Sequence, residues 1–265
     1  MRLSVRLFSS VVQKRPFYIT TPIFYVNAGT DEHGTKVQQA AAKANLPLQE
    51  YCSNISKEYR DLFRDFEVGY TDYIRTTDDK HKKAVKYFWR KLVKNDYIYK
   101  AKYAGWYSVN DEAFVPETHT KDEITKEGKV KVSIESGHRV EWTEETNYMF
   151  RLSAFKTHLQ EWLKTDGVIQ PSKFQKQLQE FLANSTYFPD ISVSRPSSRV
   201  HWAIQVPDDE EQSIYVWLDA LINYLTVTGY PDEDLMKSRR AWPPDVHVVG
   251  KDILKYGKAF KRHYH

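Results

Sequence analysis

A run of β-branched and aromatic residues, FYITTPIFYV at 17–26, passes through a short polar turn into a pattern typical of helix. From residue 35 onward apolar residues recur at spacings of three and four, and the same spacing continues over 48–66. Another helix is predicted to begin after Thr77, where acidic residues favour the positive end of the helix dipole. A strand followed by amphipathic helices predicts an α/β fold.

The middle of the chain differs from this pattern. Over 97–145 short strand-like pieces alternate with polar turns, and 118–129 is predicted to be a charged loop. Helix or strand candidates then return in four segments, at 152–163, 174–182, 214–225 and 245–249. The simplest architecture is an α/β domain that is split by a β-rich insertion.

The first thirty residues contain no aspartate or glutamate, although four basic residues lie among the first fifteen. This composition is typical of a mitochondrial presequence, which we assign to residues 1–15. Wound as a helix, the segment would place Leu3, Leu7 and Phe8 on one face. The alternative is a basic N-terminus without a targeting role. Without these four charges the formal net charge of +4 falls to zero, so charge gives no argument for nucleic-acid binding.

Composition excludes several classes of protein. Hydrophobic residues make up 41% and aromatic residues 14%, which is a globular and not a disordered composition. The single cysteine, Cys52, excludes an internal disulfide and a zinc site built from several thiolates. No stretch reaches the roughly 20 consecutive apolar residues of a membrane span, so we expect no membrane association of that kind.

The polar turn TDEHG at 30–34 is the first candidate for chemistry, because ligands of open α/β sheets bind where strands end. Successive strand residues point to opposite faces, so these side chains cannot converge on one metal ion, and we expect no metal site. The plainer interpretation is that Thr30 or Asp31 caps the following helix and Gly34 eases the turn.

The segment YVWLDALINY at 215–224 is the second candidate. Four of its residues share one helical face: Trp217, Ala220, Leu221 and Tyr224. Ordinary core packing accounts for such a stripe, and the alternative is the wall of a pocket for an apolar ligand with Asp219 beside it. Opposite charges in GKDI at 250–253 follow an apolar run and suit a zwitterion or a phosphate.

Eight segments together resemble the methionyl-tRNA synthetases in order and wording: TTPIFYVNA, GTDEHGTKV, GWYSVNDEAF, VSIESGHRVEW, TNYMFRLSAF, ISVSRPSSRVHWAIQVP, SIYVWLDALINYL and DVHVVGKDIL. The resemblance covers about 16–254, and the basic N-terminus makes the chain similar to mitochondrial forms. It implies a class I synthetase that activates methionine with ATP and transfers it to methionine tRNA. It also implies a Rossmann-type catalytic domain, interrupted by a connective-peptide insertion, with divisions at 1–15, 16–104, 105–190 and 191–265.

The resemblance further implies which residues act. Asp31 would hold the ammonium group of methionine. The rest of the methionine site would come from Ile23, Tyr25, Trp217, Ala220, Leu221, Tyr224 and Ile253. Three residues are implied as catalytic: Arg195, Lys251 and Asp252. ATP with Mg²⁺ would be the co-substrate and zinc would be absent, and the implied partners are methionine, ATP and tRNA(Met), bound by a monomer in the mitochondrial matrix.

The sequence also departs from the family pattern. In the family a loop and helix with the HIGH signature, and then a second parallel strand, precede GTDEHG, whereas Ala28 is joined directly to Gly29 here. Parallel strands need a crossover of a dozen or more residues, which this junction lacks. The KMSKS loop and the anticodon-binding domain are also missing, so we expect impaired catalysis. The alternative is a truncated, non-catalytic protein that binds methionine, tRNA or a protein partner.

Overall fold

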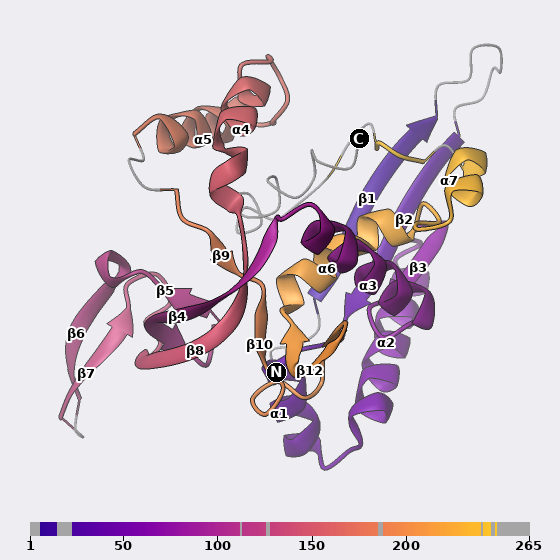
Figure 1. Cartoon of the computed structure of the whole chain (residues 1–265). Coiled ribbons are helices and arrows are strands. Elements are labelled where there is room, and N and C mark those ends of the chain that lie inside the picture. Colours follow the sequence, from indigo (N-terminus) through magenta and orange to yellow (C-terminus); the bar gives the residue numbers. More distant parts are fainter. Residues whose placement is uncertain are drawn as a thin grey trace.

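A three-stranded sheet with the order β1-β2-β3 lies along one side of the molecule (Figure 1). The computed structural model describes residues 6–14, 23–111, 113–125, 128–184, 188–239, 241–244 and 247. The three strands are β1 (Arg6–Lys14), β2 (Ile23–Asp31) and β3 (Asp72–Arg75). β2 and β3 run parallel, as the predicted α/β fold requires, whereas β1 is antiparallel to β2.

The junction between Ala28 and Gly29 lies inside β2. Ala28 pairs with Tyr73 and Gly29 pairs with Ile74 of β3, in a register that continues on both sides of the junction. The two parallel strands expected here are therefore one strand. No crossover is needed at this position, and the expected steric problem does not arise.

The N-terminal segment is a strand where an amphipathic helix was expected. β1 pairs with β2 over its whole length, from Arg6 opposite Asp31 to Lys14 opposite Ile23. Without β1, the free edge of β2 would expose a row of unpaired N–H and C=O groups, which favours addition of a strand. The assignment of residues 1–15 as a presequence stays a prediction.

Two helices connect β2 to β3, and a third follows β3. They are α1 (Thr35–Ala44), α2 (Leu48–Asp65) and α3 (Asp79–Lys94), which confirms the helical spacing of the sequence. The predicted cap by Thr30 or Asp31 is wrong, because both residues belong to β2 and no side chain caps α1. The N-cap is Gly34, whose φ of 105° favours glycine.

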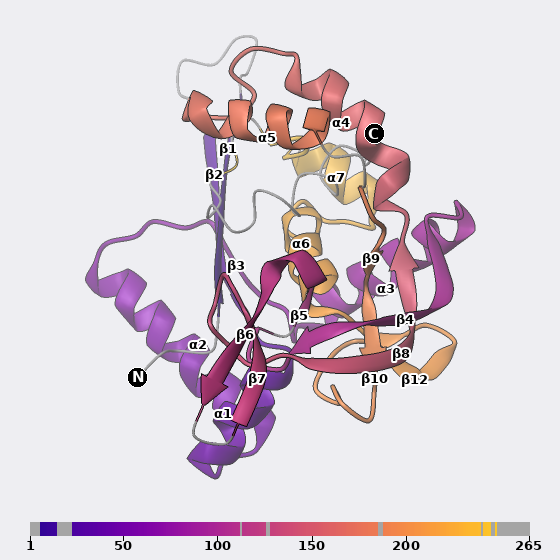
Figure 2. The same ribbon diagram turned by 90° about the vertical axis from the view of Figure 1, so that its left-hand side faces the viewer.

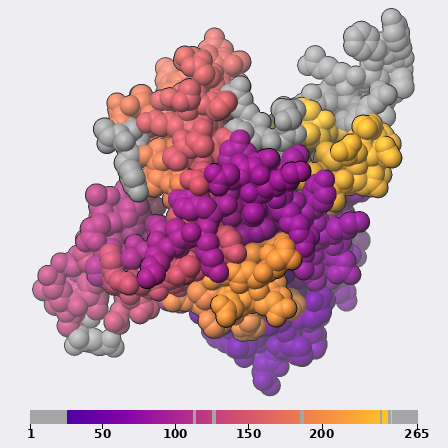
Figure 3. Space-filling view, viewed as in Figure 1, coloured from indigo at the N-terminus to yellow at the C-terminus, as the bar shows by residue number. Residues whose placement is uncertain are grey.

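The insertion is a long antiparallel arm. A four-stranded sheet has the order β5-β4-β8-β9, formed by β4 (Ile98–Ser108), β5 (Ala113–Val115), β8 (Glu141–Phe150) and β9 (Ile191–Ser192). The expected domain boundary at 104/105 falls inside β4. The charged segment 118–129 is no simple loop: it holds part of a 3-10 turn (Glu117–His119), β6 (Thr120–Thr125) and the start of β7 (Gly128–Ser133). The β6–β7 hairpin projects from the body of the molecule (Figures 1 and 3) and lies in front of it in the view of Figure 2.

After the arm the chain forms helices and then returns to the body. The remaining elements are a 3-10 turn (Leu152–Phe155), α4 (Lys156–Leu163), α5 (Ser172–Asn184), β10 (Ser194–Pro196), β11 (Gln205–Val206), β12 (Asp209–Ile214), α6 (Val216–Thr226) and α7 (Glu233–Arg239). The strand expected at 245–249 lies, apart from residue 247, outside the described residues. None of the helices in the described ranges has the length and apolar character of a membrane span.

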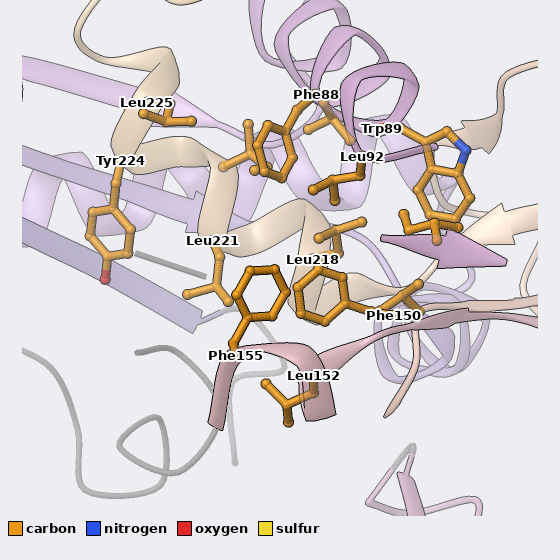
Figure 4. Packing of buried hydrophobic residues seen from close by; sticks show 14 of the residues in the cluster. Phe88, Trp89, Leu92, Phe150, Leu152, Phe155, Leu218, Leu221, Tyr224 and Leu225 are labelled. Carbon is orange, nitrogen blue, oxygen red and sulfur yellow. The ribbon is translucent and has the colours of Figure 1, made fainter. Parts of the chain in front are cut away.

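The main hydrophobic core lies where α3, α6 and the base of the arm meet (Figure 4). Phe88 and Leu92 of α3 pack near Leu218 of α6, and the rings of Phe150 and Phe155 stack with centroids 5.3 Å apart. Fully burying one such side chain contributes about 1.5–3 kcal/mol. α6 is therefore held by residues from both halves of the α/β domain and from the insertion.

Candidate functional site

Glu32, in the turn after β2, is the centre of a buried polar network. Its side chain is fully buried, and Oε1 accepts hydrogen bonds from Arg75 Nε at 2.7 Å and from Thr30 Oγ1 at 2.6 Å. Its Oε2 accepts from Thr77 Oγ1 at 2.5 Å, and its N–H donates to Thr76 Oγ1 at 2.9 Å. A buried carboxylate is tolerated only with such partners. The network thus binds the turn to the end of β3.

The backbone of the same turn is held by residues that are distant in the sequence. Trp202 Nε1 donates to the carbonyl of Glu32 at 2.7 Å, and the carbonyl of Trp202 accepts from Gly34 N–H at 3.0 Å. Cys52 Sγ also lies 3.6 Å from the Glu32 carbonyl, as a weak donor. The path of the turn is therefore set by α2 and by the β10–β11 connection as well as by its own residues.

Asp219, in the first turn of α6, lies between two histidines. Its Oδ2 is 2.7 Å from His33 Nδ1 and its Oδ1 is 2.8 Å from His81 Nε2. Burial opposes the charge of Asp219, but the two imidazoles lower the pKa of its carboxyl to about 2. Thr226 Oγ1, at the end of α6, lies 2.9 Å from His81 Nδ1. Asp219, which was expected to place a charge beside a pocket, is therefore bound to two histidines in the protein interior.

The predicted stripe on α6 forms one helical face. Ala220, Leu221 and Tyr224 are buried and Trp217 is half-buried. Leu221 and Tyr224 leave α6 on a side away from the α3 residues of the core (Figure 4). Burial raises the pKa of Tyr224 to about 12, which keeps its hydroxyl neutral. The stripe is thus an apolar, uncharged face of α6.

A direct hydrogen bond joins α6 to the sheet. Asn27 Nδ2 in β2 donates to Asn223 Oδ1 at 3.1 Å, and both side chains are buried. Asp31 lies four residues further along β2 and is 3% exposed. The middle of β2 and α6 are therefore neighbours in the structure.

Arg195, expected at the edge of the active site, is 3% exposed. Its Nη1 donates to Ser192 Oγ at 2.8 Å and to the Ser194 carbonyl at 2.7 Å, and its guanidinium carbon lies 4.2 Å from the centre of the Tyr215 ring. Its Nε has no hydrogen-bond partner among the described residues. It lines a small hollow together with Gly34, Thr35, Val216 and neighbouring apolar residues. Arg195 is thus close to the polar turn and to the start of α6.

The end of β2 with Asp31, the side chain of Arg195 and the helix α6 therefore lie in one region of the structure. Ile23 and Tyr25 belong to β2, but their side chains lie outside the described part of the chain. Lys251, Asp252 and Ile253 are also outside the described residues. No group of three or more histidine, cysteine, aspartate or glutamate side chains in the described ranges is arranged to hold a metal ion.

The sequence pattern did not indicate that Glu32, Arg75 and His81 are buried polar partners. One signal for His81 was present, because it occupies the first position of the apolar stripe of α3 that continues at three and four residues. A histidine on such a stripe is buried, and a buried imidazole needs a polar partner. Nothing in the local pattern indicated that this partner is Asp219.

The Cys52 thiol provides a test of the packing around the turn. It is fully buried, and burial together with the charge of Glu32 raises its pKa to about 12. Since the thiolate is the reactive form, we expect iodoacetamide at neutral pH to label less than about a tenth of the native chains. Labelling in concentrated guanidinium chloride should be stoichiometric, as measured by mass spectrometry. Complete labelling of the native protein would contradict this packing.

Comparison with known families agrees with this architecture. The family described as class I (M) tRNA synthetases matches residues 18–260. The chain belongs to this family. The mitochondrial methionine–tRNA ligase of Xenopus laevis is 44% identical over 93% of this chain and 48% of that protein. The human mitochondrial methionine–tRNA ligase is 43% identical over 90% of this chain and 46% of that protein.

Solved synthetase structures are similar as well. The Mycobacterium tuberculosis methionyl-tRNA synthetase bound by methionyl-adenylate aligns with a TM-score of 0.78 and 38% identity, over 88% of this chain and 45% of that chain. The resemblance to the methionyl-tRNA synthetases and the predicted fold class are therefore confirmed. The chain spans about half the length of the relatives that it matches.

Proposed function

We propose that this synthetase acts as a methionine–tRNA ligase of mitochondrial translation, located in the matrix. It would activate methionine with ATP to methionyl-adenylate and transfer the methionyl group to tRNA(Met). The observation that carries the proposal is the proximity of β2 and the turn after Asp31 to α6, the helix that carries the apolar stripe. Relatives named as mitochondrial methionine–tRNA ligases share 43–44% identity with the chain, which supports the same assignment.

The proposed methionine site has a charged end and an apolar end. Asp31 would pair with the ammonium group, because charge-assisted hydrogen bonds are the strongest available for that group. Aromatic walls hold a flexible and polarizable thioether well. In the proposed site these walls and their neighbours are Trp217, Ala220, Leu221 and Tyr224, together with Ile23, Tyr25 and Ile253.

The proposed catalytic residues are Arg195, Lys251 and Asp252. Activation requires stabilisation of negative charge while the methionine carboxylate attacks the α-phosphate of ATP and pyrophosphate leaves. The guanidinium of Arg195 is a fixed positive charge beside the turn, held against the Tyr215 ring. Mg²⁺ supplies charge neutralisation on the ATP phosphates when it is bound. Mg²⁺ bound to ATP is held mainly by phosphate oxygens and water, so it would need no dedicated carboxylate cage.

The division of the chain follows from the same proposal. Residues 16–104 and 191–265 would form the catalytic domain, 105–190 the connective-peptide insertion and 1–15 the presequence. Methionine, ATP and tRNA(Met) would be bound by a monomer without resident zinc.

A second function, ligand binding without catalysis, is favoured by one observation. The Ala28–Gly29 junction, where the family carries its HIGH segment, lies in a regular and fully paired strand. The fold thus accommodates the shorter sequence without a break in the sheet. Such a chain could bind methionine and yet lack the groups that orient the ATP phosphates.

Two assays on the full chain separate these functions. Calorimetric titration with methionine should detect binding under either function. Methionine-dependent exchange of pyrophosphate into ATP should be measurable for a ligase, and it should rise when the HIGH segment of a relative is inserted between Ala28 and Gly29. Binding without exchange in both forms would favour the second function, and absence of methionine binding would contradict both.

Replacing Asp31 with Asn should weaken methionine binding about 30- to 100-fold, because the ammonium group would lose a charged partner. Calorimetric titration gives the dissociation constant. Asp166→Asn is the matched control, since Asp166 is exposed in the helical part of the insertion and should leave the constant unchanged. Equal affinity of Asp31→Asn and the unsubstituted chain would remove Asp31 from the proposed site.

A further inference from the structure

Asp219 connects two elements of the proposed methionine site, the helix α6 and the turn after β2. Its side chain is fully buried, and both of its carboxylate oxygens are engaged by the histidines His33 and His81. It precedes Ala220 of the α6 wall, and its partner His33 lies two residues after Asp31. The hydrogen bond between Asp219 and His33 therefore joins the wall helix to the turn that carries the proposed ammonium-binding residue.

The direction of the hydrogen bonds in this cluster follows from charge. The Asp219 carboxyl is ionised at neutral pH, and an ionised carboxylate only accepts hydrogen bonds. His33 must therefore donate from Nδ1 and His81 from Nε2. The other nitrogen of His81, Nδ1, lies within hydrogen-bond distance of Thr226 Oγ1. The same Oγ1 lies 3.1 Å from the carbonyl oxygen of Ile222. Each side chain of the cluster has its position set by at least one other member.

His81 holds α6 at two levels. Asp219 and Thr226 are seven residues apart, so they lie on the same helix face about two turns, or roughly 10 Å, apart. One imidazole bonds to both side chains. A rotation of α6 or a shift along its axis would lengthen at least one of these bonds.

The wall residues lie on the other side of the helix. With about 100° per residue, the four stripe residues fall roughly 100° to 200° around the axis from Asp219. They are Trp217, Ala220, Leu221 and Tyr224. Because His33 and His81 fix the position of Asp219, they also fix the rotation of α6 about its axis. This rotation sets the direction in which the stripe faces.

We propose that Asp219 is a positioning residue, which acts through His33 and His81 to set the placement of the methionine-facing side of α6 relative to Asp31. The inference rests on the proposed function, because it assumes that this face of α6 lines the amino-acid site. Asp219 takes no part in the chemical step. Its effect should appear in the affinity for methionine and in the discrimination between methionine and side chains of similar size.

The first test is Asp219→Asn in the full chain, titrated calorimetrically with methionine and with norleucine. We expect methionine to bind about tenfold more weakly and the preference for methionine over norleucine to fall severalfold. A purely structural role would lower the number of competent molecules, seen as reduced stoichiometry, and leave the affinity and the preference unchanged. Asp234→Asn, on exposed α7, is the control and should change neither quantity.

Thr226→Ala is a milder variant in case Asp219→Asn fails to fold. Its control is Thr228→Ala, because Thr228 is also buried and its hydroxyl also bonds to a backbone carbonyl, but it does not contact His81. Hydrogen exchange should be faster in α6 of Thr226→Ala than in the control, and the preference for methionine should be lower.

The outcomes distinguish this proposal from the proposed function. If the unsubstituted chain binds methionine and both cluster variants keep its affinity and preference, the positioning role of Asp219 is wrong and the site stands. If the unsubstituted chain binds no methionine, the proposed function fails and the positioning role fails with it. Reduced affinity and preference in the cluster variants, with unchanged controls, supports the proposal.

Discussion

Replacement of Glu32 with Ala is expected to lower the free energy of unfolding by about 3–5 kcal/mol. The substitution leaves the guanidinium of Arg75, whose side chain is 18% exposed, without its carboxylate partner. The hydroxyls of Thr30 and Thr77 lose the same acceptor. Breaking a buried ion pair from one side is costly because the remaining charge stays desolvated. Urea denaturation followed by circular dichroism measures the change.

The matched control for this experiment is Glu58→Ala. Glu58 is exposed on α2, and an exposed substitution of this kind should change the free energy of unfolding by less than about 0.5 kcal/mol. Glu32→Gln keeps an acceptor oxygen for one hydroxyl and should fall between the two. A loss below about 1 kcal/mol for Glu32→Ala would show that the network does not hold the turn.

Gly29→Val should destabilise the protein by about 3 kcal/mol. A Cβ atom at Gly29 would lie 2.1 Å from the carbonyl oxygen of Ile74, so β2 and β3 would have to separate. Valine favours strands, and strand propensity alone would predict the opposite sign. Urea denaturation therefore distinguishes packing from propensity at this position.

The control for Gly29→Val is Gly69→Ala, because a Cβ atom at Gly69 meets no atom within 4 Å. This variant should keep its stability to within about 1 kcal/mol. If Gly29→Val were as stable as the control, the close parallel pairing of β2 with β3 would be incorrect. That pairing contains the Ala28–Gly29 junction, so the result also tests the continuity of β2 across this junction.

Several elements could be predicted because their signals are local. The apolar stripe of α3 repeats at three and four residues, and the helix forms at Asp79–Lys94 as predicted. The charged segment 118–129 was predicted to be a loop, since its polar residues carry no apolar alternation. It nevertheless contains β6, which is stabilised by backbone pairing with β7 from Thr120 opposite Ser133 to Thr125 opposite Gly128. Pairing partners of this kind are not visible in the local pattern.

Some features of the candidate site also had local sequence signals, and others depended on distant residues. The motifs GTDEHGTKV and YVWLDALINY predicted Asp31 and the stripe of α6 as site residues, because motifs of this length preserve the identity of residues whose contacts are long-range. The same wording indicated neither that Glu32 is buried on Arg75 nor that His33 and His81 share one carboxylate. These partners lie 43 to 186 residues apart.

The sequence by itself determined the family, the α/β class and the main helices, and it predicted the residues of the proposed methionine site. Helical periodicity and the residue order of a motif are properties of neighbouring residues, so they can be recognised without coordinates. Only the tertiary structure decided that the Ala28–Gly29 junction continues one strand and that the carboxylate of Asp219 lies between two histidines. A helix pattern specifies which residues share a face, but the chemistry of that face depends on which distant segment packs against it.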